Sequence, residues 1–262
     1  MANSDIATNI ELPLLAASGI CKSFGGIQAV DNAEIQVAKG SITGLIGPNG
    51  AGKTTLFNLL SNFIRPDKGK VIFDGEPIHH LQPHQIALQG LVRTFQVARA
   101  LSRLTVLENV MLAAQKQTGE NFWQVQFQPH VINKEEKQIR EKAMLVLQSV
   151  GLERKAHDYA GGLSGGQRKL LEIGRALMTN PKLILLDEPA AGVNPTLIRE
   201  ICERISVWNE QGMTFLIIEH NMDVIMSLCH RVWVLAEGRN LACGSPEEIQ
   251  NNSEVLQAYL GQ

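Results

Sequence analysis

The sequence has little cysteine and no excess of charge of either sign. Its 262 residues include four cysteines, Cys21, Cys202, Cys229 and Cys243, and no two of them form a C-x-x-C pair. Such spacing indicates buried or free thiols in a reducing cytosol. The 24 Lys and Arg residues and 26 Asp and Glu residues give a formal net charge of -2. Because there is no basic surplus, nucleic acid is not indicated as a partner, and any polyanion must be bound locally.

Long apolar runs are also missing. The longest, such as LILL and FLII, are the size of a strand and fall well short of the ~20 residues that a membrane helix requires. We therefore expect the chain not to span a bilayer. The first residues, MANSDIATNIELP, contain neither a basic segment nor a long apolar stretch, so they do not resemble a secretory signal. We expect residues 1–12 to form a flexible tail.

What the sequence does contain is a strand and helix alternation. A chain that is 44% hydrophobic can bury one sizeable core with a smaller lobe attached, and we expect a single domain at 13–262. Residues 14–24 and 29–40 alternate like two antiparallel strands. Later segments alternate between strand and helix, which is typical of a parallel sheet covered by helices. Residues 82–163 have a mainly helical and polar pattern, which predicts an inserted helical subdomain at about 97–165.

The segment GPNGAGKTT matches the phosphate-binding pattern G-x-x-x-x-G-K-[ST] between a predicted strand and a predicted helix. Successive backbone N–H groups in such a loop surround phosphate oxygens, while the lysine reaches the β- and γ-phosphates and the next hydroxyl binds magnesium. A glycine-rich turn that only begins a helix is the alternative, but it would need neither the lysine nor the whole pattern. The predicted binding residues are Gly47, Pro48, Asn49, Gly50, Ala51, Gly52, Lys53, Thr54 and Thr55, with Thr54 as a metal ligand.

A second polar site is predicted where LILLDE ends in Asp187 and Glu188. Ligands of parallel α/β sheets lie beyond the carboxyl ends of the strands, so these side chains should emerge near the phosphates. Adjacent strand residues point to opposite sides. This favours Asp187 as an outer or water-mediated magnesium partner and Glu188 as the base that polarises the attacking water. A solvated pair at a strand end is the alternative.

Four weaker candidates can also be explained by ordinary structural roles. His220 ends the strand FLIIEH and could donate to a γ-phosphate, although a histidine there is more often structural. Gln96 in RTFQ is an ordinary loop residue unless magnesium lies nearby. Phe24 could stack on a purine or pack in the core. The histidines of IHHLQPHQ could suggest a metal site, but no cysteine or carboxylate accompanies them, and a solvated loop explains them.

The stretch GGLSGGQRKLLEIGRALMTNP raises the question of why a helix begins with two glycines. Ser164 and Gln167 have the spacing of a capping box, in which each side chain satisfies a backbone N–H. Gly165 and Gly166 are not needed for that cap, and each costs a helix about 1 kcal/mol relative to alanine. Glycines at a helix start are useful when an anion must approach bare N–H groups at the positive end of the helix dipole. The two glycines therefore indicate an anion close to this helix start, and that Ser164 and Gln167 bind nucleotide with them is implied only by the family resemblance described next.

These motifs occur in the order and spacing of ATP-binding-cassette (ABC) ATPases, a family that the chain resembles over nearly its whole length. LSGGQ is the specific element, because many NTPases share the P-loop. The resemblance implies an α/β fold with a P-loop NTPase (RecA-like) core, a mostly parallel sheet, an N-terminal antiparallel β subdomain and an inserted helical subdomain. It also implies ATP and Mg2+ as cofactors. Two ATPase domains would dimerise head to tail, with each ATP between one P-loop and the LSGGQ helix of the other domain.

The resemblance also implies residue roles. Gln96 falls at the Q-loop, which senses magnesium and couples to membrane subunits. Glu188 falls at the catalytic glutamate, His220 at the switch histidine and Phe24 at the aromatic that stacks on adenine. The two glycines of LSGGQ would leave room for the γ-phosphate of the nucleotide bound by the partner.

A narrower resemblance links the chain to the ATP-binding subunits of bacterial hydrophobic or branched-chain amino acid importers, close to the cyanobacterial neutral amino acid permease type. The matching stretches include GLVRTFQVARALSRLTVLENVMLAAQ, DEPAAGVNP, IIEHNMDVIMSLCHRVWVLAEG and SEVLQAYLG. Asn194 departs from the aspartate usual in the wider family, and the intact LSGGQ departs from a subgroup in which this signature is often degenerate.

This resemblance implies a homodimer, or a heterodimer with a paralogous ABC ATPase, on the cytoplasmic face of the bacterial inner membrane. Its partners would be two transmembrane permease subunits and, indirectly, an extracytoplasmic amino acid-binding protein. A urea or lipopolysaccharide transporter has a similar outline. A soluble ABC protein of translation or DNA repair would need two cassettes or a long coiled-coil insertion, neither of which is present. The presence of Glu188 and His220 disfavours a purely regulatory nucleotide binder.

Overall fold

The computed structural model describes residues 12–94, 100–115 and 129–260. A six-stranded sheet forms the centre of the molecule, in the order β10-β9-β3-β8-β7-β6. Its four neighbouring pairs from β9 to β6 are parallel, and only β10 runs antiparallel to β9. This confirms the mostly parallel sheet. The strands are β3 (Ile42–Ile46), β6 (Leu91–Arg93), β7 (Leu183–Asp187), β8 (Thr214–Ile218), β9 (Arg231–Ala236) and β10 (Arg239–Gly244).

A second, four-stranded sheet is antiparallel, in the order β2-β1-β4-β5. Leu15 on its central strand pairs with Val37 on one side and with Phe73 on the other. The antiparallel N-terminal strands predicted from alternation are therefore present. Their bounds are β1 (Leu15–Phe24), β2 (Ile27–Val37), β4 (Lys68–Phe73) and β5 (Glu76–Pro77).

The central strands are buried on both faces, which explains their continuous apolar runs. Alternate residues of β7 enter opposite cores: Ile184 and Leu186 pack into one hydrophobic cluster, and Leu183 and Leu185 into the other. The first cluster also contains residues of α6, α7 and α8, and the second contains residues of α1 and the antiparallel sheet. The carboxyl ends of β3, β7 and β8 are thereby fixed at one edge of a rigid layer.

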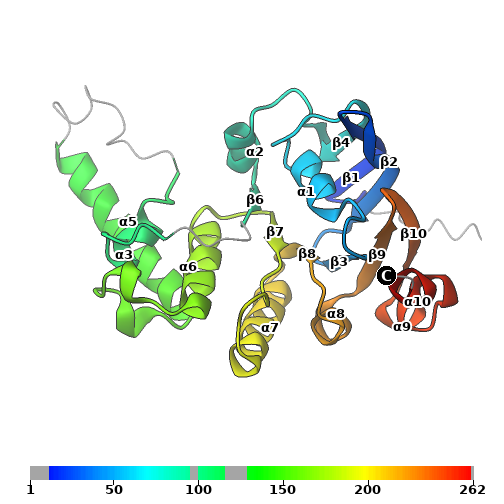
Figure 1. Ribbon diagram of the computed structural model, residues 1–262. Coiled ribbons are helices and arrows are strands. Elements are labelled where there is room, and N and C mark those ends of the chain that lie inside the picture. Colours follow the sequence, from blue (N-terminus) through cyan, green and yellow to red (C-terminus); the bar gives the residue numbers. More distant parts are fainter. Residues whose placement is uncertain (1–11, 95–99, 116–128, 261–262) are drawn as a thin grey trace, which may run out of the picture.

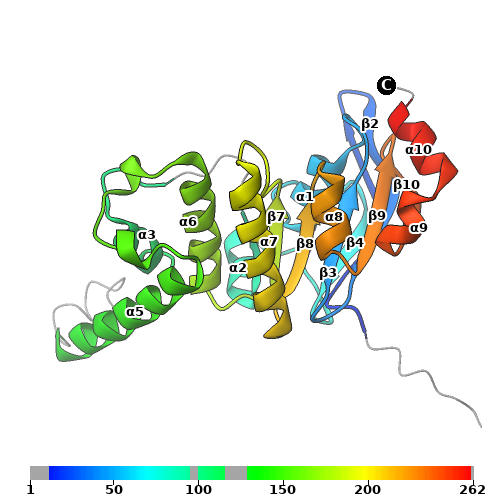
Figure 2. The ribbon, with the colours of Figure 1, turned by 90° about the horizontal axis from the view of Figure 1, so that it is seen from below.

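Helices α3, α5 and α6 gather at one end of the molecule, and α9 and α10 lie at the opposite end beside β10 (Figures 1 and 2). Helices α7 and α8 cover a face of the central sheet (Figure 2). The helix bounds are α1 (Lys53–Leu60), α2 (Pro83–Gln89), α3 (Val106–Met111), α5 (Pro129–Ser149), α6 (Gly165–Met178), α7 (Pro195–Glu210), α8 (Met222–Leu228), α9 (Pro246–Gln250) and α10 (Ser253–Leu260). Within the described ranges, no helix combines the length and apolar character that a bilayer crossing requires.

One segment differs from the expectation of a mainly helical stretch at 82–163. Residues Leu91–Arg93 form β6, an edge strand that pairs in parallel with β7. Gly90 ends α2 in a left-handed conformation, φ 105°, and turns the chain directly into this strand. Three residues are too few to show strand alternation, so the pattern gave no signal for β6.

Candidate nucleotide-binding site

The P-loop connects β3 to α1, as its sequence pattern predicts. Two of its glycines are required by close backbone approach. Gly47, φ 149°, and Gly52, φ 94°, would each bring a Cβ against a carbonyl group, that of Leu235 and that of Ala29 respectively. By contrast, nothing lies within 4 Å of the position a Cβ of Gly50 would occupy. The loop is thus clamped at both ends and open at its tip.

Lys53 is the first residue of α1, and its ammonium group bridges the P-loop. Its Nζ donates to the carbonyl oxygens of Gly47 at 2.7 Å and Pro48 at 2.9 Å. Burial lowers the pKa of the Lys53 ammonium, and the charge of Glu188 acts in the opposite direction. A cation at a helix start, next to the free N–H groups of the first turn, makes this loop a strongly anion-attracting surface.

A cleft of about 380 Å³ opens above this loop. Its lining combines P-loop residues 49–55 and the start of β2 with two side chains from distant strands, Glu188 and His220. Thr54 is exposed within this lining. The structure therefore brings the phosphate loop, the hydroxyl beside its lysine, a carboxylate and an imidazole into one hollow.

Glu188 lies directly after β7 and is held through its backbone as well as its side chain. It adopts a left-handed conformation, φ 49°, which is uncommon for a residue other than glycine. Its N–H donates to the Ile218 carbonyl at 3.0 Å, and its own carbonyl accepts from Nζ of Lys169 at 2.7 Å. Its Oε1 lies 2.9 Å from Nε2 of His220. The carboxylate and the imidazole thus form a pair at the cleft.

Asp187 is buried and makes an ion pair with Arg93 of β6. Arg93 Nη2 lies 2.8 Å from Asp187 Oδ2, and the two side chains are 6% and 5% exposed. Arg93 also donates from Nη1 to Asn58 Oδ1 at 2.6 Å, and its guanidinium lies 5.5 Å from the Phe57 ring centre. Arg93 was not among the predicted site residues. The only feature of the sequence that could have pointed to Arg93 is its charge, which lies in an otherwise apolar short segment close to Gln96.

Two other predicted residues are placed less directly. Gln96 lies outside the described residues. Phe24 ends β1 and is 45% exposed, with Nζ of Lys22 5.6 Å from its ring centre. Its strand partner, Ile27, lines the cleft, whereas Phe24 is not among the described lining residues. Phe24 is therefore exposed next to a residue of the cleft and is available for stacking. The alternative that Phe24 packs in the core is wrong.

The LSGGQ segment forms the predicted capping box at the start of α6. Ser164 N–H donates to Gln167 Oε1 at 3.0 Å, and Gln167 N–H donates to Ser164 Oγ at 3.3 Å. The two glycines differ. Gly165 is exposed with nothing near its missing Cβ, whereas a Cβ on Gly166 would contact the Leu197 side chain. Gly166 therefore has a packing reason within the chain, and only Gly165 requires an external explanation.

Asn194, the departure from the wider family, caps α7. Its Oδ1 accepts from the Leu197 N–H at 2.9 Å. Asparagine and aspartate are about equally good at this position, so the substitution preserves the local structure. At the histidine-rich stretch, the rings of His79 and His80 meet edge to face at 5.6 Å.

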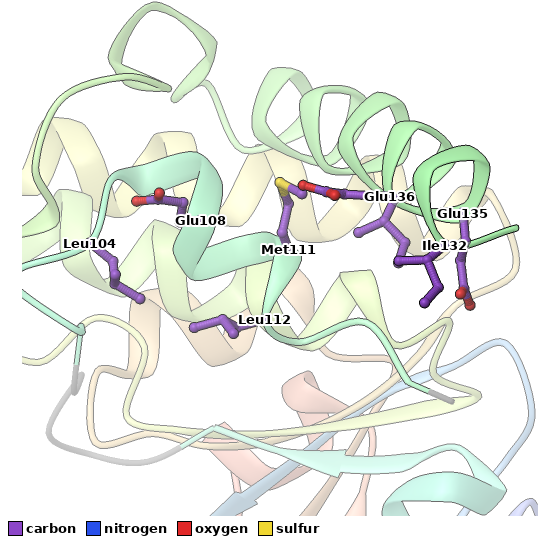
Figure 3. Close-up of a pocket in the computed structure, with 8 residues that line it drawn as sticks. Leu104, Glu108, Met111, Leu112, Ile132, Glu135 and Glu136 are labelled. Atoms are coloured by element: carbon purple, nitrogen blue, oxygen red, sulfur yellow. The ribbon is translucent and has the colours of Figure 1, made fainter. Parts of the chain in front are cut away.

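A separate hollow of about 350 Å³ lies between α3 and α5 (Figure 3). Figure 3 shows its walls coming from α3, from the turn before it and from the first turns of α5. Apolar side chains alternate there with three carboxylates. The lining residues are Leu104, Glu108, Met111, Leu112, Ile132, Glu135, Glu136 and Ile139.

Comparison with known proteins decides the family. Residues 30–191 match the family model described as ABC transporter, and residues 239–262 match that described as Branched-chain amino acid ATP-binding cassette transporter. The chain belongs to the ABC transporter family. As an ABC ATPase domain, it binds nucleotide and hydrolyses ATP. The resemblance drawn from LSGGQ and the P-loop is thereby confirmed.

Curated relatives match over almost their whole length. The probable branched-chain amino acid transport ATP-binding protein LivG of Archaeoglobus fulgidus is 42% identical over 254 residues, covering 95% of this chain and 96% of the relative. The high-affinity branched-chain amino acid transport ATP-binding protein BraF of Pseudomonas aeruginosa is 40% identical, covering 95% and 98%.

Solved structures match equally well. A nucleotide-free ATP-binding cassette from an ABC transporter superposes with a TM-score of 0.83 at 40% identity, covering 96% of this chain and all of that one. The ADP conformation of another such cassette gives a TM-score of 0.82 at 38% identity, again over 96% of this chain. The α/β P-loop NTPase fold predicted for the chain is therefore confirmed.

Proposed function

We propose that this ABC ATPase energises an importer for neutral and branched-chain amino acids. The single observation that carries the site is the cleft that unites the P-loop with Glu188 and His220. The substrate class is supported by the names of LivG and BraF and by the family match at residues 239–262. The described lining of the cleft consists of the P-loop, the start of β2, Glu188 and His220, and the transported substrate binds elsewhere in the assembly.

The roles follow from position and chemistry. Lys53 binds the β- and γ-phosphates, aided by the N–H groups of residues 47–55. Glu188 accepts a proton from the attacking water, and His220 donates to the γ-phosphate and orients the carboxylate. Gln96 acts at the same site as Lys53, Glu188 and His220. Phe24 stacks on the adenine.

The oxygen donors present suit Mg2+. Thr54 offers a hydroxyl in the cleft beside the Glu188 carboxylate, and hard oxygens of this kind are what the ion prefers, whereas Asp187 is buried against Arg93 and is not among the described lining residues. Thr54 would hold the ion, with Asp187 and Gln96 as outer partners. When bound, it would neutralise charge on the β- and γ-phosphates.

We infer that a second cassette completes the site, as a homodimer or as a heterodimer with a paralogous ABC ATPase. The support is Gly165, an exposed glycine at the N-terminus of α6 without a neighbour that requires it. An N-terminus of this kind attracts phosphate oxygens. Gly165→Asp should leave ATP binding by the isolated chain unchanged and abolish ATP-dependent dimerisation in light scattering. Normal dimerisation of that variant would remove α6 from the nucleotide site.

The remaining partners are two transmembrane permease subunits and, through them, an extracytoplasmic amino acid-binding protein. Nucleic acid is not among them. We place the protein at the cytoplasmic face of the bacterial inner membrane. The helices α3 and α5, which follow the Q-loop along the chain, would pass the closing motion of the dimer to the permeases.

Uptake by bacterial cells tests the proposal. Cells carrying Lys53→Ala should lose uptake of labelled neutral and branched-chain amino acids and keep uptake of acidic and basic ones and of urea. Lys70→Ala, at an exposed position of β4, is the matched control and should have no effect. Unchanged amino acid uptake with loss of urea uptake would overturn the substrate class while leaving the ATPase assignment intact.

A further inference from the structure

Glu219 is a buried carboxylate that the roles above leave without a task. It follows β8 directly and is 3% exposed. Its Oε1 accepts from the N–H of Ala190 at 2.7 Å. Its Oε2 accepts from the N–H groups of His220 at 3.1 Å and Asn221 at 3.4 Å. No cation makes an ion pair with Glu219 in the described part of the chain.

These bonds join two loops that carry the reaction. Ala190 lies two residues after Glu188, in the loop that leads into α7. His220 lies in the loop between β8 and α8. The Glu219 side chain therefore fixes the loop that contains His220 relative to the loop that begins at Glu188.

The same connection continues toward the LSGGQ helix. Val193 and Leu197, which follow Ala190 along the chain, are the side chains that lie against Gly166 of α6. Packing against α6 on one side and hydrogen bonds to Glu219 on the other thus hold the loop of residues 188–194 between α6 and the loop that contains His220.

Only a carboxylate can make this arrangement. Both of its oxygens accept, so it satisfies N–H groups from two directions at once. Glutamine of the same shape has one accepting oxygen, and its NH2 group would face a backbone N–H. A carboxylate buried without a cation is costly unless charge-assisted hydrogen bonds compensate it. An apolar side chain would be enough to fill the space at the end of β8. The charge of Glu219 therefore serves the hydrogen bonds to the two loops and not the packing.

We propose that Glu219 is a positioning residue for ATP hydrolysis, which holds His220 and the loop after Glu188 in the arrangement that acts on the γ-phosphate. The inference rests on the proposed roles of Glu188 and His220. It adds a buried residue that is not among the described lining of the cleft and that acts through the backbone of both loops.

The test is Glu219→Gln in the full-length protein, with Glu210→Gln at the exposed end of α7 as the matched control. We expect Glu219→Gln to lower kcat by ~10-fold or more while the Kd for ATP stays within about 2-fold, because the P-loop is untouched. The control should leave both unchanged. Wild-type kcat in Glu219→Gln would overturn the inference, and so would a loss of ATP affinity as large as the loss of kcat.

A double-mutant cycle separates positioning from general destabilisation. Because Glu219 acts through His220 as well as through the loop after Glu188, Glu219→Gln should lower the residual rate of a His220→Ala variant by a smaller factor than it lowers the wild-type rate. Full multiplication of the two losses would overturn the inference. If Glu188→Gln and His220→Ala both hydrolyse ATP at the wild-type rate, the proposed site fails and this inference with it. If they are slow and Glu219→Gln is not, only the inference fails.

A measurement on the unaltered protein covers the case in which Glu219→Gln does not fold. Residue-resolved hydrogen exchange should show the amides of Ala190 and His220 strongly protected, although both lie in loops. Exchange of either amide at the rate of a solvated loop would contradict the bridge.

Discussion

Replacing Arg93 by methionine should destabilise the protein more than any surface substitution. The change removes the partner of Asp187 but keeps an unbranched side chain to fill the space. Because both charged groups of the pair are at least nine-tenths buried, the carboxylate would be left uncompensated. Breaking such a pair costs about 3–5 kcal/mol, and the lost bond to Asn58 adds about 1 kcal/mol. We therefore expect the free energy of unfolding to fall by roughly 4–6 kcal/mol.

Urea unfolding followed by circular dichroism measures this loss. Lys182→Met is the matched control, since Lys182 pairs with Asp74 at 2.5 Å but the two side chains are 53% and 49% exposed. That substitution should cost less than about 1 kcal/mol. The double variant Arg93→Met with Asp187→Asn should recover part of the loss, because no unpaired charge then remains. A loss below about 1 kcal/mol in Arg93→Met would refute the argument that the pair compensates a buried charge.

Three further predictions concern single residues. Glu188→Gln should lower the hydrolysis rate by roughly 10²–10⁴-fold and keep ATP binding, which steady-state kinetics and equilibrium binding will show; a wild-type rate would remove its role as base. Gly166→Ala should have a free energy of unfolding about 1 kcal/mol lower than Gly165→Ala, because both gain the helix preference of alanine but only the Cβ at position 166 displaces Leu197; equal urea midpoints of the two variants would contradict the packing difference. Burial, with the charges of neighbouring groups, raises the pKa of Cys229 to about 12 from 9.0. The thiol therefore ionises more easily in the unfolded chain, so the stability that it contributes is fully present below pH 9 and is lost as the pH rises toward 12. At pH 8.5, Cys229 should resist iodoacetamide in the native protein and react in urea; native alkylation detected by mass spectrometry would contradict its burial.

Local patterns were sufficient to predict the elements that carry the motifs. The P-loop lies between a strand and a helix, and the Ser164 and Gln167 cap forms as drawn from a spacing of three residues. The parallel sheet followed from apolar strand-sized runs between helical segments. β6 was missed because it has only three residues, and its position was decided by pairing with β7, far away in sequence.

Contacts between distant segments could not be predicted in the same way. Arg93 is 94 residues from Asp187, Glu219 is 29 residues from Ala190, and Lys169 is 19 residues from Glu188. Each of these charged residues looks ordinary in the sequence because nothing local distinguishes it from a solvated one. Their burial and their partners are products of the fold, so only the structure could assign them.

These three residues explain how the chain holds Glu188 and the residues around it in place. A residue in a left-handed conformation, such as Glu188, persists only where its surroundings determine it. Lys169 holds its carbonyl, Glu219 holds the loop that follows it, and the Arg93 pair holds the residue before it. Because the energetic cost of ordering is met during folding, closure of a dimer would have to supply only the missing phosphate contacts. Lys169 also lies on α6, so displacement of the LSGGQ helix would reach the Glu188 backbone through one hydrogen bond, without a change in the P-loop.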